Sequence, residues 1–164
     1  MKNFKSCLII IAVSLTYSSF AQISVTGTAY TEIVSLATAN ETVQLNFGRF
    51  YPEAGGGSIT LSPEGIRMAY GNVKLLDGPY SQGVFTIAGS ENNSLNIMLP
   101  TTPQLLYHNN SINTISLDQW TYYIPKTTSG DVYVNIGATL NFGPLESNPP
   151  GLYTGTYQII FSYY

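Results

Sequence analysis

The sequence predicts an all-β fold, a β-sandwich of antiparallel strands, with almost no helix outside an expected signal peptide. Two observations carry this prediction. Apolar and polar residues alternate with the period of a strand in many short segments, and turn residues separate these segments at intervals of about ten residues. No window keeps the three-and-four spacing of an amphipathic helix over a dozen residues.

The first expected strands precede a glycine-rich stretch. An uncharged N-terminal stretch has apolar or small residues at every second position, namely Ile23, Val25, Gly27 and Ala29. A β-prone run over 31–37 and a strand over 42–47 follow it. Residues 51–57 are expected to form a loop, because three consecutive glycines lose much chain entropy inside a regular element.

The middle of the chain contains shorter strand candidates. Turn residues at 63–65 and 91–94 divide this region, and the second set predicts a hairpin between the strands on either side of it. The predicted strands cover residues 59–61, 66–75, 83–88, 95–99, 105–107, 112–117 and 120–124.

Two strands stand out near the C-terminus. The alternation over 132–142 is the longest in the chain and predicts a central strand. Residues 152–163 predict a closing strand with one aromatic side and one polar side. Its apolar side is expected to carry Tyr153, Gly155, Tyr157, Ile159, Phe161 and Tyr163.

The N-terminus has the pattern of a secretory signal peptide over 1–21. A positive start precedes an apolar stretch and the small-x-small site Ser19-Phe20-Ala21. The alternative is a membrane-spanning helix, but the apolar run is shorter than the ~20 residues that a bilayer requires. We therefore expect one domain over 22–164, without a membrane span, in the periplasm, at the outer-membrane surface or outside the cell.

Composition excludes several classes of function. With 6 basic and 9 acidic residues in the chain, there is no basic patch for nucleic acid. The only cysteine, Cys7, lies in the expected signal peptide, which excludes disulfides and cysteine chemistry in the mature domain. The sole histidine, His108, lies in a predicted turn, and no nucleophile motif or phosphate loop is present. We expect no enzymatic activity, cofactor or metal.

Three aromatic residues are candidates for contact with a ligand. Trp120, Tyr122 and Tyr123 form a cluster whose flat rings could stack on sugar rings. The favoured interpretation is that Trp120 and Tyr122, two residues apart on one strand face, pack in the core instead.

Several strings, taken together and in order, resemble a secreted bacterial family of unknown function, family 4402. They lie at 45–48, 56–65, 137–140 and 151–157, with an aromatic residue at the end of the chain. That family is similar to spore coat protein U and to the subunits of archaic chaperone-usher pili. The resemblance implies an immunoglobulin-like sandwich and a role in surface fibres or coats, and it brings no catalytic residues with it.

Two hypotheses follow. In the first, the protein is a structural subunit that assembles with copies of itself or with other surface subunits by β-strand addition. The candidate donor strand is Ile23, Val25, Gly27 and Ala29, and the candidate acceptor edge is Tyr153, Tyr157, Ile159, Phe161 and Tyr163. An ordinary first strand within its own domain is the equal alternative for the donor segment. In the second hypothesis, the protein is a self-contained module that binds a glycan near Trp120, Tyr122 and Tyr123.

Overall fold

The structure is a computed structural model that describes residue 28 and residues 38–88, 95–126 and 130–163. All the strands described below belong to one compact unit. The expected signal peptide, the candidate donor strand and the β-prone run over 31–37 therefore lie outside the described residues, apart from Thr28.

The described residues form strands and no helix, which confirms the predicted all-β class. No helix in this part of the chain has the length and apolar character needed to cross a membrane. The strands are β1 (Thr38–Val43), β2 (Phe50–Leu61), β3 (Arg67–Leu75), β4 (Gly83–Ala88), β5 (Leu95–Met98), β6 (Gln104–His108), β7 (Thr114–Tyr123), β8 (Val132–Phe142), β9 (Tyr153–Thr154) and β10 (Ile160–Tyr163).

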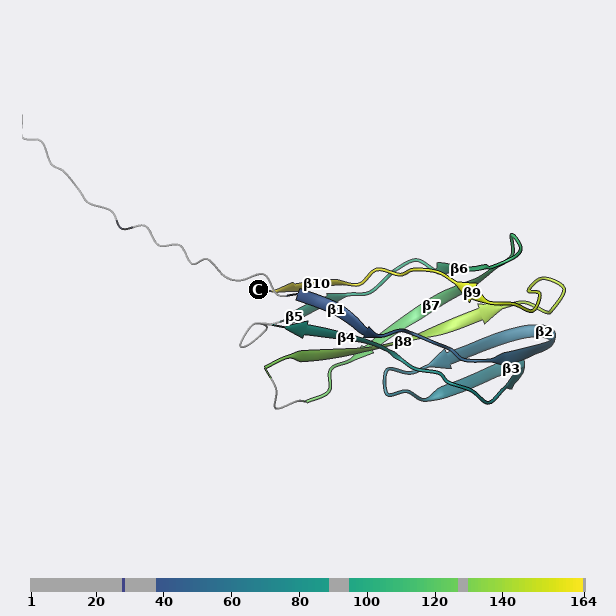
Figure 1. Cartoon of the computed structure of the whole chain (residues 1–164), viewed down its shortest axis with the longest axis horizontal. Helices are drawn as coiled ribbons and strands as arrows, with labels where there is room; N and C mark the ends of the chain where they lie inside the picture. The colour runs from purple at the N-terminus through teal and green to yellow at the C-terminus, as the bar shows by residue number, and fades with distance from the viewer. Residues whose placement is uncertain (1–27, 29–37, 89–94, 127–129, 164) are drawn as a thin grey trace, which may run out of the picture. The chain divides into compact units, whose positions relative to one another are not determined.

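Strand β8 is central, as its long alternation predicts (Figure 1). One side of β8 pairs with β7, and the other side pairs first with β4 and then with β2. The main sheet has the order β1-β4-β8-β7-β6-β9, with β3 added beside β2, and β5 pairs with β10 in a second sheet. All pairings are antiparallel. Among the described strands, the main sheet therefore has free edges at β1, at β9 and at β3.

The core consists of two apolar clusters that share β8. Val134 and Ile136 from β8 belong to one cluster, against which the small β5-β10 sheet packs with Ile97 and Phe161. The next inward residues of β8, from Ala138 to Phe142, belong to the other cluster, together with residues of β2 and β7. Trp120 packs against both clusters, so that one side chain connects the two halves of the core.

The glycine-rich stretch is not the loop that its composition predicts. Residues 51–57 belong to β2, but the pairing with β3 jumps from Pro52↔Val73 to Gly57↔Gly71. The four residues between them bulge from the ladder, and Gly55 and Gly56 have φ angles of 97° and 71°. Glycine adopts this left-handed conformation without steric cost, so its abundance marks a bulge inside a strand here.

The pairing also differs from expectation at three further places. The strand expected over 42–47 is β1 over Thr38–Val43, and past it only an isolated bridge joins Asn46 to Ser81. The segments predicted over 112–117 and 120–124 form one strand, β7, with a bulge at Gln119, whose φ is 49°. The hairpin predicted between β4 and β5 does not form, because β4 pairs with β1 and β8 whereas β5 pairs with β10.

The closing strand keeps its alternation but changes partner midway. Its first part, β9, pairs with β6, and its last part, β10, pairs with β5. Tyr153, Tyr157, Ile159 and Phe161 are partly buried, whereas Thr154, Thr156, Gln158, Ile160 and Ser162 are exposed. The side chain of Tyr163 lies outside the described set.

Candidate functional site

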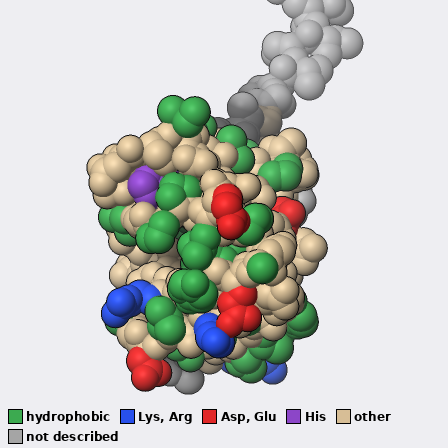
Figure 2. All heavy atoms as spheres, turned by 90° about the vertical axis from the view of Figure 1, so that its right-hand side faces the viewer, with side chains coloured by type: hydrophobic (Ala, Val, Ile, Leu, Met, Phe, Trp, Pro, Cys, Tyr) green, Lys and Arg blue, Asp and Glu red, His purple; other side chains and the backbone are tan. Residues whose placement is uncertain are grey.

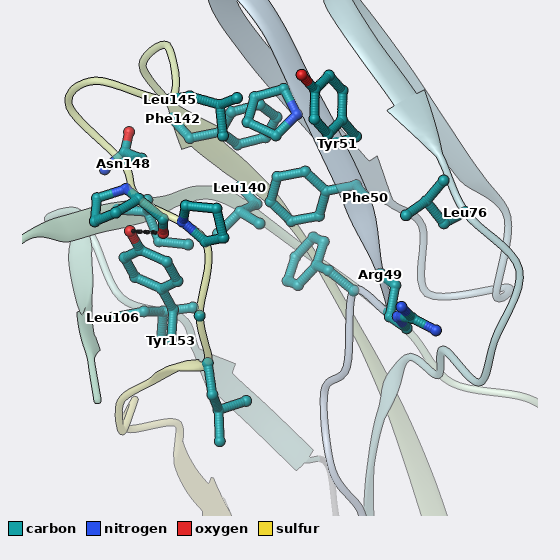
Figure 3. Close-up of a pocket in the computed structure, with 18 of the residues that line it drawn as sticks. Arg49, Phe50, Tyr51, Leu76, Leu106, Leu140, Phe142, Leu145, Asn148 and Tyr153 are labelled. Carbon is teal, nitrogen blue, oxygen red and sulfur yellow. Dashed lines mark hydrogen bonds between the residues drawn. The ribbon is translucent and has the colours of Figure 1, made fainter. Parts of the chain in front are cut away.

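An apolar cavity of about 380 Å³ opens between two segments that lie far apart in the sequence (Figure 3). One wall is residues 45–52, which lead from β1 into β2, and the other is residues 148–153, which lead into β9. Core residues form its floor, including Ile115, Leu140 and Phe142. Such a volume lies in the lower part of the range of about 300–1,000 Å³ that is typical of ligand pockets.

The first wall is held by polar contacts on the side away from the cavity. Asn46 exchanges two backbone hydrogen bonds with Ser81, of 2.8 and 2.9 Å. The Arg67 guanidinium donates to the carbonyl oxygens of Phe47 at 3.0 Å and of Leu76 at 3.1 Å, and its Cζ lies 4.3 Å from the centroid of the Tyr80 ring. These contacts fix the backbone of the wall and leave the Phe47 side chain to pack on the core.

The second wall is held by Asn148, which is buried. Its Oδ1 accepts from the amide of Gly143 at 2.6 Å, and its Nδ2 donates to the carbonyl oxygen of Thr114 at 2.9 Å. The Tyr153 hydroxyl then donates to the carbonyl oxygen of Pro149 at 2.9 Å (Figure 3). Burial raises the pKa of Tyr153. The loop between β8 and β9 is therefore anchored to the sheet although it contains two consecutive prolines.

The terminal segment beside this cavity has an unpaired backbone. The pairing of β9 with β6 ends at Thr154, and the pairing of β10 with β5 begins at Ile160. Residues 155–159 between them belong to no ladder among the described strands. Backbone amides and carbonyls without a strand partner need water or another chain as hydrogen-bond partners, so this edge can accept a strand.

Tyr157 is the contact that joins this edge to β1. Its hydroxyl donates to Oε1 of Glu41 at 2.6 Å, which is short, as expected for a bond to a carboxylate. Its ring lies 4.9 Å from Trp120 and 6.2 Å from Phe85, measured between ring centroids. Burial raises the pKa of Tyr157 strongly, and the hydrogen bond to Glu41 and the charge of Glu41 raise it further.

His108 braces the second wall of the cavity. Its Nδ1 accepts from the amide of Asn110 at 3.1 Å and lies 2.9 Å from the Ser111 hydroxyl. Its Nε2 lies 3.1 Å from the carbonyl oxygen of Pro150, and its ring packs edge-on against Tyr153. A backbone carbonyl lies beside the ring nitrogen at which a Ser-His-Asp triad would have its carboxylate.

Figure 2 shows this end of the molecule, where hydrophobic side chains gather near the histidine and acidic and basic side chains lie among and below them. Leu152, which lines the cavity, is 63% exposed, and its neighbour Tyr107 on β6 is 59% exposed. In the described part of the chain, no group of three or more His, Cys, Asp or Glu side chains comes together to hold a metal ion.

The structure brings some of the sequence candidates together. Of the acceptor candidates, Tyr153 borders the cavity, while Ile159 and Phe161 pack on the cluster below β5. Trp120 packs in the core, whereas Tyr122 and Tyr123 are 47% and 46% exposed. The first wall is absent from the sequence candidates, because no local signal indicates that residues 45–52 lie opposite residues 148–153.

Comparison with known proteins gives one result. Searches of curated proteins and of solved structures found no match to this chain. A family model described as "Domain of unknown function (DUF4402)" matches residues 36–163, which includes every strand and both walls of the cavity. The chain therefore belongs to this family, domain of unknown function DUF4402.

Proposed function

We propose that this protein is a non-enzymatic structural subunit, secreted or displayed at the cell surface, that assembles by β-strand addition in the manner of pilin or coat subunits. The observation that carries the proposal is the gap between the free edge of β1 and the terminal segment that follows β9. On one side of the gap lie β1 and residues 45–52, and on the other side lies the terminal segment with its unpaired residues 155–159.

The chemistry of the gap suits an extended peptide. Its floor is apolar, which favours burial of alternate side chains of an added strand, and its terminal edge offers unpaired backbone groups. Main-chain hydrogen bonds would supply affinity, and the cavity would supply selectivity for one or two side chains. The partner is a second copy of this chain or another surface subunit, and its donor is a segment such as Ile23, Val25, Gly27 and Ala29.

The alternative, a carbohydrate-binding module centred on Trp120, Tyr122 and Tyr123, has weaker support. Trp120 packs against both core clusters, which leaves little of its ring for a ligand. Tyr122 pairs with Ile136 and Tyr123 pairs with Asn135. Because consecutive residues of a strand point to opposite faces, these two tyrosines do not form a common platform.

The test compares matched variants of the exported chain, whose expected first residue is Gln22. Replacing Ile23 and Val25 by Asp places charges on the side of the donor expected to enter the apolar gap. Replacing Ser24 and Thr26 by Asp adds the same charge on the other side. We expect the first variant to remain a folded monomer and the second to assemble like wild type, as measured by size-exclusion chromatography with light scattering.

Deleting residues 22–28 tests whether the domain folds without the candidate donor strand. Under the proposal, the deletion leaves a folded monomer that no longer assembles. The proposal is wrong if the deletion unfolds the domain while the intact exported chain stays monomeric at high concentration.

A further inference from the structure

The gap between β1 and the terminal segment differs along its length. Beside Tyr153 it contains the open cavity of about 380 Å³. Four residues further along the terminal segment, the Tyr157 side chain spans to Glu41 on β1 at 2.6 Å. Four residues of an extended strand span about 13 Å. One part of the gap is therefore open, and the next part is occupied by a phenol.

The space beneath the Tyr157 phenol is filled. Its ring lies against Trp120 and Phe85, which belong to or contact the core cluster below β5. A Cβ placed on Gly83 of β4 would lie only 2.9 Å from the Tyr157 hydroxyl, so β4 leaves no room beneath the phenol. The phenol cannot move inward, and a strand added at this level has to pass over it.

We propose that Tyr157 determines which strand the gap accepts, by requiring a small residue at its own level and directing large side chains to the cavity beside Tyr153. This inference rests on the proposed function. The occupant is residues 23–29 of a second copy, because the side chains at every second position change from large to small along the segment, as the gap requires. Ile23 and Val25 are branched and suit the cavity, whereas Gly27 and Ala29 are small and suit the level of Tyr157.

The order of sizes also sets the direction of the added strand. Ile23 and Gly27 are four residues apart, as are Tyr153 and Tyr157. Large residues meet the cavity and small residues meet Tyr157 only if the added strand runs parallel to the terminal segment and antiparallel to β1. In the opposite direction, Ile23 and Val25 would face the end where Ile159 and Phe161 already fill the core.

The experiment is a double-mutant cycle in the exported chain, between Gly27→Leu and Tyr157→Leu. The readouts are the concentration at which half of the chain is assembled, from light scattering, and the fluorescence of the single tryptophan, which contacts Tyr157. We expect Gly27→Leu to raise the half-assembly concentration by about tenfold, which corresponds to about 1.4 kcal/mol and lies within the usual range for overpacking. Adding Tyr157→Leu should bring it back to within roughly threefold of the Tyr157→Leu single variant.

Two controls identify the cause. Ile23→Leu keeps the side-chain volume in the cavity and should leave assembly nearly unchanged. Tyr157→Phe keeps the ring but removes the bond to Glu41, and it should not rescue Gly27→Leu, because the obstruction is the ring. If Tyr157→Leu does not fold, Gly27→Ala supplies the second comparison and should assemble like wild type.

The outcomes separate this inference from the proposed function. Leucine has a higher strand propensity than glycine, so without the constraint from Tyr157 the Gly27→Leu change should strengthen assembly. If Gly27→Leu assembles as well as wild type, or if its loss is equally large without the Tyr157 ring, the inference fails while strand addition stands. If the wild-type chain does not assemble at all, both fail.

Discussion

Tyr157 is partly buried, donates a hydrogen bond to a carboxylate and links two segments that lie far apart in the sequence. Its hydroxyl donates to Glu41 at the free edge of β1, and its ring rests on Trp120, which connects the two core clusters. The residue therefore links β1 to the terminal segment, although no backbone ladder joins the two. Its phenol must stay protonated for the bond to Glu41, since a phenolate and a carboxylate at 2.6 Å would repel each other.

This requirement predicts a dependence of stability on alkaline pH. Burial, followed by the bond to Glu41 and its charge, raises the pKa of Tyr157 in the folded state above the unfolded value of about 10. Above pH 10 the unfolded chain binds fewer protons at this residue than the folded chain, so the free energy of unfolding falls as pH rises. Urea titrations from pH 8 to pH 11 should show a smaller fall for Tyr157→Phe than for wild type. Equal slopes for the two proteins would contradict this assignment.

At the scale of elements, the outward face of β8 is closely packed, as its apolar face is. Gly137 lies on the outward face, where the turn after β2 crosses β8. A Cβ at this position would collide with the carbonyl oxygen of Leu61 and would lie 2.7 Å from the nitrogen of Pro63. These are backbone atoms, which cannot turn aside as a flexible side chain can.

We therefore predict that Gly137→Ala destabilises the domain by about 2 kcal/mol or more, at the upper part of the usual overpacking range. The matched control is Gly143→Ala, where the nearest atoms belong to the side chains of Asn148 and Ser147 at 3.3 Å, so that no backbone atom obstructs the added methyl group. Its loss should be about 1 kcal/mol or less. Urea denaturation of both variants measures the difference, and a larger loss in Gly143→Ala would contradict the crossing of the turn over β8.

The alternation of apolar and polar residues predicts strand β8 correctly. It fails where pairing with a segment far away in the sequence determines the structure. Strand β8 follows its pattern because its inward positions from Val134 to Phe142 are buried. The glycine-rich part of β2 does not, because pairing with β3 on both sides of the bulge, and with β8 from Gly57 onward, keeps the glycines within a strand that their own propensity disfavours. The absent β4-β5 hairpin has the same cause, since β5 finds its partner in β10 at the far end of the chain.

One part of the candidate site could be predicted from local sequence, and the other part could not. The terminal segment could be proposed as an edge because its alternation is strong and local. The opposite wall could not, because about a hundred residues separate Leu45 from Tyr153 and only the folded topology brings their segments to one cavity. The role of Tyr157 was equally hidden, since Glu41 lies 116 positions away.

At the scale of the whole domain, the main sheet is open. Its order begins with β1 and ends with β9, and the Tyr157–Glu41 bond links β1 to the segment that follows β9 without pairing their backbones. A sheet with unpaired edges is prone to association with other chains. The proposed function uses that property, because an added strand pairs both edges and covers the apolar floor at once.

The shared strand β8 and the shared Trp120 predict that the two core clusters unfold together. Ile136 belongs to one cluster and Leu140 to the other, and both are buried. Truncating either to Ala should cost about 2–5 kcal/mol. In each variant, tryptophan fluorescence and far-ultraviolet circular dichroism should report a common, lowered denaturation midpoint. If Ile136→Ala moved only one of the two signals, the two clusters would unfold independently.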